Sequence, residues 1–167
     1  MKDGGSDVTG TEPAAATRLA RPEDAASLSI IDSLVSGRPG TARRFEACCH
    51  GQQGLACGSL ETALVMEAQG RIIGFLVFAR VLDEVSIYNI VIHPDDQGRG
   101  LGREILESSL AYFRRGGALR CLLEVRESNR AARSLYRACD FELVGRRKNY
   151  YPSRDGREDA LLMSRQL

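Results

Sequence analysis

A glycine-rich turn is the clearest chemical feature of the sequence. Gln97, Gly100 and Gly102 follow the apolar run 90–92 and precede a stretch with the apolar spacing of a helix. Glycines let the backbone approach an anion closely, and the N–H groups at a helix start favour phosphate oxygens. Arg99 adds a positive charge to the turn. These residues predict a diphosphate site, although they also fit a tight turn without a ligand.

The spacing of this turn disfavours two common nucleotide sites. It lacks the Gly-Lys-Ser/Thr ending of a P-loop, which argues against nucleotide hydrolysis. It also lacks the three glycines and the opening β-α-β unit of a dinucleotide-binding fold.

Two further residues have the chemistry of a base and an acid. Glu124 lies late in the apolar run 118–125, where its carboxylate can act as a general base. The same pattern fits a glutamate that points to water or pairs with Arg126. The hydroxyl of Tyr136 can donate a proton, but its place on the apolar side of a helical pattern also fits a core side chain. Both interpretations of each residue remain open at this point.

The elements that must position these residues alternate in a regular order. We expect a disordered tail over residues 1–16 and a single domain over residues 17–167. The predicted order β-α-α-β-β-β-α-β-α-β-β indicates an α/β (α+β) fold with a mixed, mostly antiparallel sheet. Hydrophobic periodicity places strands at 17–20, 62–68, 71–81, 85–92, 118–125, 142–148 and 159–165, and helices at 21–36, 101–115 and 128–139, with a short helix and loop in 41–59.

Composition excludes several classes of protein. The five cysteines show no C-x-x-C spacing and the two histidines complete no zinc pattern, so we expect free thiols, no metal and a cytoplasmic location. No apolar run approaches the roughly 20 residues needed to cross a bilayer, so we expect no membrane partner.

Charge is distributed unevenly along the chain. Residues 1–96 hold 8 Lys/Arg and 13 Asp/Glu, whereas residues 97–167 hold 15 and 9. A basic second half suits a polyphosphate ligand, and it equally suits a solvated surface. No nucleic-acid reader motif appears, so no nucleic-acid partner is expected. The oligomeric state stays open, with a monomer favoured.

Several stretches resemble a known family. The turn resembles the pyrophosphate-binding turn Q/R-x-x-G-x-G/A of the GNAT acetyltransferases. The resemblance is to the ribosomal-protein alanine N-acetyltransferase family within that group, and it covers residues 62–163 well and 17–34 loosely. It is carried by residues 82–84, 89–90, 123–126, 128–129, 135–136, Phe141, 147–152 and 155–160. Asp140 stands where that family usually has a glycine, at a helix end where a left-handed conformation is expected.

The resemblance implies a GNAT fold that uses acetyl-CoA as co-substrate. The coenzyme is expected between the strands 85–92 and 118–125. Backbone groups of Ile90, Val91 and Ile92 would contact the pantetheine and the thioester. The pyrophosphate would be held by Gln97, Gly98, Arg99, Gly100, Leu101 and Gly102, with Asn129 contacting the coenzyme from the next helix. Asn129 also fits the N-terminal cap of that helix.

The resemblance also implies an acceptor and a mechanism. The acceptor is the N-terminal alanine of a protein of the small-subunit ribosomal type, which attacks directly in a ternary complex with Glu124 as base and Tyr136 as acid. Tyr150 and Tyr151 resemble a loop that closes over the peptide, and they also fit an aromatic patch in the final hairpin.

One segment departs from the family pattern. Residues 41–59 replace an aromatic stretch of the family, and the chain has no tryptophan. A small-molecule amine or a lysine side chain therefore remains an alternative acceptor. A non-catalytic acyl-CoA-binding module is the weaker alternative, because Glu124 and Tyr136 are both present.

Overall fold

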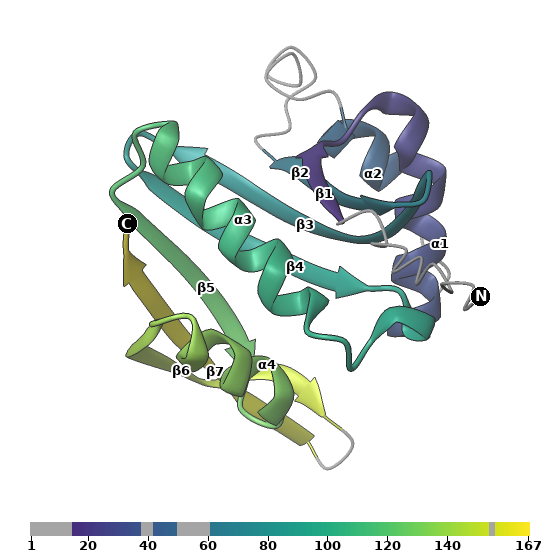
Figure 1. Ribbon diagram of the computed structural model, residues 1–167. Helices are drawn as coiled ribbons and strands as arrows, with labels where there is room; N and C mark the ends of the chain where they lie inside the picture. Colours follow the sequence, from purple (N-terminus) through teal and green to yellow (C-terminus); the bar gives the residue numbers. More distant parts are fainter. Residues whose placement is uncertain (1–14, 38–41, 50–60, 154–155) are drawn as a thin grey trace, which may run out of the picture.

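The computed structural model describes residues 15–37, 42–49, 61–153 and 156–167. Its strands form one seven-stranded sheet in the order β1-β2-β3-β4-β5-β7-β6 (Figure 1). The predicted element order is confirmed. The strands are β1 (Ala16–Leu19), β2 (Glu61–Ala68), β3 (Arg71–Val81), β4 (Glu84–Ile92), β5 (Arg120–Arg126), β6 (Glu142–Ser153) and β7 (Gly156–Gln166), and the helices are α1 (Ala25–Ser36), α2 (Ala42–Cys49), α3 (Leu101–Arg115) and α4 (Arg130–Ala138).

Neighbouring strands in the described sheet are antiparallel except β4 and β5, which run parallel. A parallel pair needs a crossover, and α3 supplies it on the way from β4 to β5. The expectation of a mixed, mostly antiparallel sheet is therefore confirmed.

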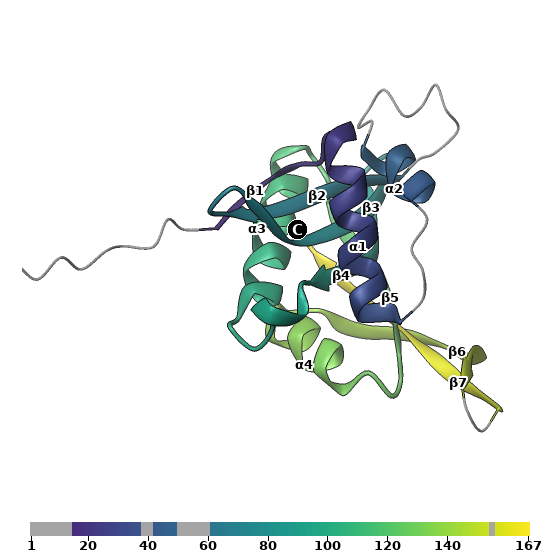
Figure 2. The same ribbon diagram turned by 90° about the vertical axis from the view of Figure 1, so that its right-hand side faces the viewer.

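The last two strands are longer than the sequence predicts. The expected polar loop between residues 148 and 159 is mostly strand, so Tyr150 and Tyr151 lie on β6 and not on a loop. An irregularity in pairing between Arg147 and Tyr151 lets β6 continue past these polar residues. The far ends of β6 and β7 project from the body of the sheet (Figure 2).

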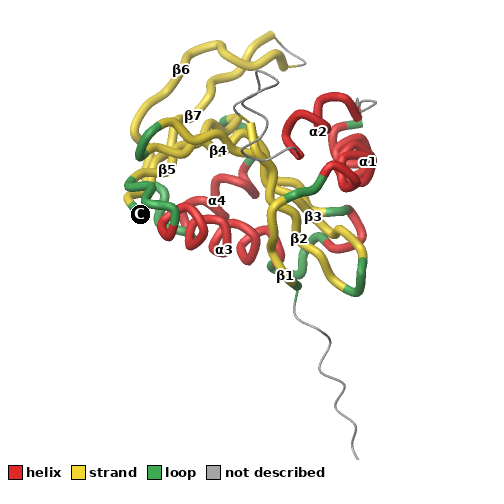
Figure 3. Tube along the Cα trace, turned by 90° about the horizontal axis from the view of Figure 1, so that it is seen from above, coloured by secondary structure: helices red, strands yellow, loops and turns green. Residues whose placement is uncertain are grey.

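Helices cover both faces of the sheet (Figure 3). On one face α1 and α2 pack on the sheet through a core that includes Leu28, Phe45 and Phe75. On the other face α3 and α4 enclose a second core, to which α3 contributes Ile105 and Phe113. The apolar residues of α3 recur at helical spacing on one side, which is why that side is buried.

Two expected segments are described only in part. The expected tail, residues 1–16, lies outside the described residues apart from Ala15 and Ala16, and Ala16 already belongs to β1. The short helix expected within 41–59 is α2, whereas residues 50–60 lie outside the described part of the chain. No helix in the described ranges has the length and apolar character to cross a membrane.

Candidate functional site

The parallel strands β4 and β5 stop pairing half-way along their length. Their pairing runs from Glu84↔Arg120 to Ile87↔Leu123 and goes no further, although β4 continues to Ile92. At this point Ile87 and Asn89 pair with successive residues of β3, so Tyr88 is the extra residue of a β-bulge. A bulge bends its strand and increases the local twist. The bend therefore opens a gap between the two strands, with β4 on one side and the end of β5 on the other (Figure 1).

Alternate residues of β4 present their backbone groups to this gap. The N–H of His93 donates to the carbonyl oxygen of Ile73 on the β3 side (2.8 Å). Because backbone groups of an antiparallel strand alternate in direction, those of Val91 also face β3 and those of Ile90 and Ile92 face the gap. The side-chain nitrogen Nε2 of Gln97 donates to the carbonyl oxygen of Ile92 (3.0 Å), which agrees with that carbonyl facing the gap.

The turn after β4 fits a diphosphate. Gly98 (φ 77°) and Gly100 (φ 81°) adopt the left-handed region, and a Cβ atom at either position would meet nothing within 4 Å. Gly100 is the N-cap of α3 and no side chain caps this helix, so its first N–H groups can bind an external acceptor. A Cβ atom on Gly102 would lie 3.6 Å from Leu135, so this position is closed in by α4.

Asn129 caps α4, as the sequence predicts. Its Oδ1 accepts a hydrogen bond from the N–H of Ala132 (3.1 Å). Because the cap uses the oxygen, a ligand contact from Asn129 would come from its amide nitrogen.

Glu124 lies one residue beyond the last β4–β5 pair. Its neighbours Leu123 and Val125 are buried against α3 and α4, so the side chain of Glu124 points to the opposite face and is 30% exposed. Its Oε1 lies 3.1 Å from Nη2 of Arg147. The pairing with Arg126 considered from the sequence is not formed, because Arg126 pairs with Glu158 (2.9 Å).

Tyr136 is a buried side chain of α4 that packs against Phe141, with ring centroids 5.9 Å apart. Burial raises the pKa of Tyr136 to about 12, and the nearby Tyr151 adds to the shift. A phenol with this pKa stays protonated at neutral pH, as a proton donor must. The core position and the donor role are therefore compatible.

Tyr150 and Tyr151 form an aromatic pair beside Glu124. Their rings meet edge to face at 5.0 Å. The guanidinium of Arg147 lies 5.3 Å from the Tyr150 ring and that of Arg126 lies 4.3 Å from the Tyr151 ring. Burial raises the pKa of Tyr151, and the charge of Glu124 raises it further. The fold thus brings Arg147 and Tyr151 of β6 to the carboxylate of Glu124, and Tyr151 also lies near Tyr136 of α4.

The bulge in β6 that carries these tyrosines is held by β7. Asn149 is left-handed (φ 52°), and its N–H donates to Oδ1 of Asp159 (2.8 Å). Arg157 donates to the carbonyl oxygens of Asn149 (2.6 Å) and Tyr150 (2.7 Å). Arg147 and Arg157 had no predicted role, although the dense charges of 147–160 were the available signal.

The described cysteines do not add a nucleophile to the gap. Cys48, Cys49, Cys121 and Cys139 are buried free thiols, and burial raises the pKa of Cys48 to about 12, which argues against a nucleophile there. No metal-binding group of three His, Cys, Asp or Glu residues occurs in the described ranges.

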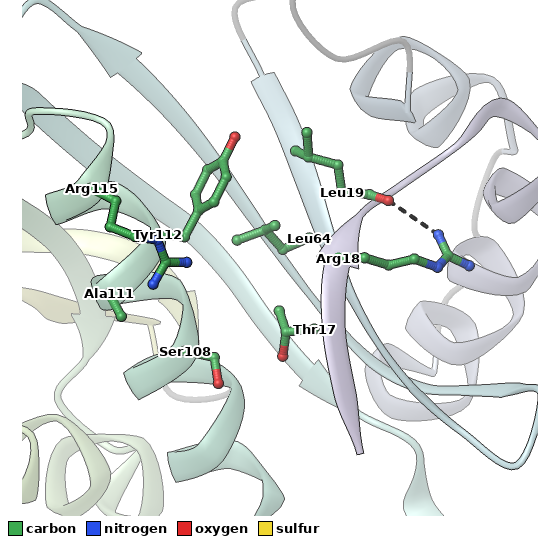
Figure 4. A pocket seen from close by; sticks show the side chains of 8 residues that line it. All are labelled: Thr17, Arg18, Leu19, Leu64, Ser108, Ala111, Tyr112 and Arg115. Carbon is green, nitrogen blue, oxygen red and sulfur yellow. Dashed lines mark hydrogen bonds between the residues drawn. The ribbon is translucent and has the colours of Figure 1, made fainter. Parts of the chain in front are cut away.

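A cavity of about 540 Å³ lies away from the gap, between β1 and the second half of α3 (Figure 4). Its lining includes Leu19, Leu64, Tyr112 and Arg115, and none of the residues assigned above. We therefore do not include this cavity in the candidate site.

The comparison with known families agrees with this geometry. Residues 38–141 match the family described as "Acetyltransferase (GNAT) family". The chain belongs to the GNAT acetyltransferase family. The seven-stranded sheet with helices on both faces is accordingly a GNAT fold.

Individual members of the GNAT family extend the comparison. The [ribosomal protein bS18]-alanine N-acetyltransferase of Escherichia coli (strain K12) is 43% identical over 95 residues, which are 57% of this chain and 64% of that protein. A putative enzyme of the same name from Bacillus subtilis is 39% identical over 100 residues, 60% of this chain and 65% of that one. The matched segment thus spans less than two thirds of these relatives.

A solved structure matches over a longer stretch. The crystal structure of the ribosomal-protein-S18-alanine N-acetyltransferase from Escherichia coli superposes with a TM-score of 0.78 at 30% identity. The superposition covers 92% of this chain and 94% of the other.

Proposed function

We propose that this protein transfers the acetyl group of acetyl-CoA to the N-terminal α-amino group of a protein that begins with alanine, of the ribosomal protein bS18 type. One observation carries the proposal: β4 and β5 separate at Ile87↔Leu123, immediately before Glu124. A carboxylate therefore stands at the mouth of a gap that has a phosphate-binding turn at the end of one of its strands. The names of the relatives supply the acceptor class.

The donor substrate is proposed to lie in the gap. The N–H groups at the start of α3 would bind the diphosphate, and Ile90 and Ile92 would offer backbone groups to the pantetheine. The residues proposed to contact the donor are Ile90, Ile92, Gln97, Gly98, Arg99, Gly100, Leu101, Gly102 and Asn129. Val91, which the sequence also suggested, is left out because its backbone groups face β3 and its side chain is buried. Acetyl-CoA supplies the activated acetyl group, and no metal takes part in the proposal.

Acetyl transfer from a thioester to an amine needs one proton acceptor for the amine and one proton donor for the leaving sulfur. A protein α-amino group has a pKa of roughly 7.7–8.0, so most acceptor molecules carry a proton at neutral pH. Glu124 would accept that proton and pass it to solvent, which leaves a neutral amine to attack the acetyl carbon. It would then accept the second proton that the nitrogen loses as the amide forms. The N–H of Ile92 faces the gap and would stabilise the developing oxyanion. As the carbon–sulfur bond breaks, Tyr136 would donate its proton to the sulfur.

The acceptor is proposed to approach on the face that carries Glu124. Tyr150 and Tyr151 border the carboxylate there, and their rings offer apolar area for the first residues of a peptide. The four described cysteines are free thiols, in keeping with the reducing cytoplasm that we propose as the setting.

A peptide assay tests the acceptor class. We expect acetyl-CoA and a peptide beginning Ala-Arg to yield a product acetylated at its N-terminus, located by fragment-ion mass spectrometry. The matched control is the same peptide with a blocked N-terminus and a free lysine. Acetylation of the lysine alone, or faster turnover of small amines in a parallel panel, would replace the proposal by the alternative that the divergence of residues 41–59 favours.

A further inference from the structure

Asp96 carries a buried carboxylate next to the phosphate-binding turn. It ends the short 3-10 helix η3 (Pro94–Asp96), which joins β4 to the turn at residues 97–102, and it is 3% exposed. Removing a carboxylate from water costs several kcal/mol, so a buried one needs compensating partners.

Two arginines provide that compensation from opposite sides of Asp96. Nη1 of Arg99 lies 3.0 Å from Oδ1, and Nη2 of Arg71 lies 2.9 Å from Oδ2. Oδ2 makes this ion pair without accepting a hydrogen bond from the described residues. Because Arg71 is the first residue of β3, the carboxylate ties the turn to a strand of the sheet.

Neighbouring bonds hold the same segment in place. The N–H of Asp96 donates to the carbonyl oxygen of His93 (2.9 Å), and the side chain of Gln97 donates to that of Ile92 (3.0 Å). The ring of His93 accepts from the N–H of Asp95 and lies 3.9 Å from Oδ2 of Asp96. The turn is therefore anchored on both strands that precede it.

Arg99 is the turn residue that most needs an anchor. It stands between Gly98 and Gly100, both with positive φ, where the backbone has the greatest freedom. Its ion pair with Asp96 limits the directions that its guanidinium can take. A loop ordered before binding loses less conformational entropy when the ligand arrives.

We propose that Asp96 is a positioning residue that holds Arg99 and the turn 97–102 in the arrangement that binds the phosphates of the donor. This inference rests on the proposed function, because it assumes that the turn binds acetyl-CoA. It adds a residue that contacts no substrate and acts through Arg99 and Arg71.

The direction in which donor affinity changes when Asp96 is neutralised distinguishes a positioning role from a direct electrostatic effect on the ligand. The negative charge of Asp96 repels a diphosphate, so by charge alone its removal would strengthen donor binding. If Asp96 positions Arg99 and the turn, its removal should weaken donor binding. Asp95 is the matched control, because it carries the same charge one residue away and its side chain is 85% exposed.

Calorimetric titration with CoA tests the inference on the full chain. We expect Asp96→Asn to weaken binding about 10-fold, which is about 1.4 kcal/mol, and Asp95→Asn to stay within about twofold of the unchanged protein. In steady-state assays Asp96→Asn should raise KM for acetyl-CoA and leave kcat at saturation and KM for the acceptor unchanged. Binding of Asp96→Asn as tight as that of the unchanged protein, or tighter, overturns the inference.

A second variant covers the case in which Asp96→Asn does not fold. Arg71→Met leaves Asp96 paired with Arg99 but removes the link to β3, and it should weaken CoA binding at least about threefold. Unchanged affinity in Arg71→Met then overturns the inference. If the unchanged protein itself does not bind CoA, both the proposed function and the positioning role of Asp96 fail. If it binds CoA and both variants match it, the positioning role alone fails.

Discussion

Glu124 of β5 and Arg147 of β6 form an ion pair across β7, which lies between their strands. Leu162 of β7 pairs with Glu124, Ala160 pairs with Arg147, and the two charged side chains meet above them at 3.1 Å. The pair is half-exposed, so it contributes little to stability. In the proposed mechanism, an acceptor ammonium would therefore replace the guanidinium of Arg147 on Glu124 at small cost.

Replacing Glu124 by Gln should stop catalysis without stopping donor binding. The amide cannot accept the proton of the acceptor amine, so we expect kcat to fall by about 10²–10⁴-fold. The affinity for CoA, measured by calorimetry, should not change. Glu142→Gln, an exposed glutamate at the start of β6, is the control. Full turnover of Glu124→Gln would assign the base to another group.

Tyr136→Phe should lower kcat by about 10²-fold or more, because it removes the proposed proton donor. The ring contact with Phe141 is kept, so the melting temperature should move by only a few degrees. Stopped-flow or steady-state measurement of thiol release gives the rate. Unchanged kcat in a folded variant would show that Tyr136 is not the proton donor to the leaving sulfur.

Stability should fall at alkaline pH through the buried thiols. Burial raises the pKa of Cys121 and of Cys48 from 9.0 to about 12 and that of Cys49 to about 11. The folded state binds these protons more tightly than the unfolded chain, so their contribution is complete below pH 9 and is lost as the pH rises from about 9 to 12.

Urea titrations between pH 7 and 11 measure this loss. Between the pKa of a thiol in the unfolded chain and its pKa in the folded protein, the free energy of unfolding falls by about 1.4 kcal/mol per pH unit for each thiol. Cys121→Ala should be less stable than the unchanged protein at pH 7 but should lose less stability above pH 9. Parallel pH profiles for the two proteins would contradict the assignment of the loss to this thiol.

Gly100→Ala should affect both stability and donor binding. A Cβ atom at φ 81° costs about 1–2 kcal/mol, and the added methyl group lies where the phosphates are expected. Gly37→Ala is the matched control, because Gly37 also has positive φ (65°) and open space around it. Both variants should lose similar stability, and only Gly100→Ala should lose affinity for CoA. Equal affinities would argue against phosphate binding at this turn.

Asp140→Gly should stabilise the fold by about 1 kcal/mol. Asp140 follows α4 with φ 57°, a conformation that glycine adopts without strain. The change removes only a 3.6 Å contact with Arg165 from a side chain that is 82% exposed, which is worth little. Urea unfolding measures the difference, and a lower midpoint for Asp140→Gly would show that the ion pair outweighs the strain.

The sequence by itself determined the order of the elements, the turn after β4, the cap at Asn129 and the left-handed conformation of Asp140. These features depend on residues close together in the chain, such as apolar spacing, glycines beside a helix start and the residue that follows a helix. Their physical causes are therefore present in short stretches of sequence.

Only the tertiary structure decided where β4 and β5 separate, that β6 runs on through Tyr150 and Tyr151, and that Arg147 meets Glu124 and Arg71 meets Asp96. The separation follows from a bulge at Tyr88, and the length of β6 follows from bonds that Arg157 and Asp159 make across the hairpin. The pairs Glu124–Arg147 and Asp96–Arg71 join residues that lie far apart in the chain. Pairing register and long-range ion pairs depend on how distant segments pack, so no local pattern contains them.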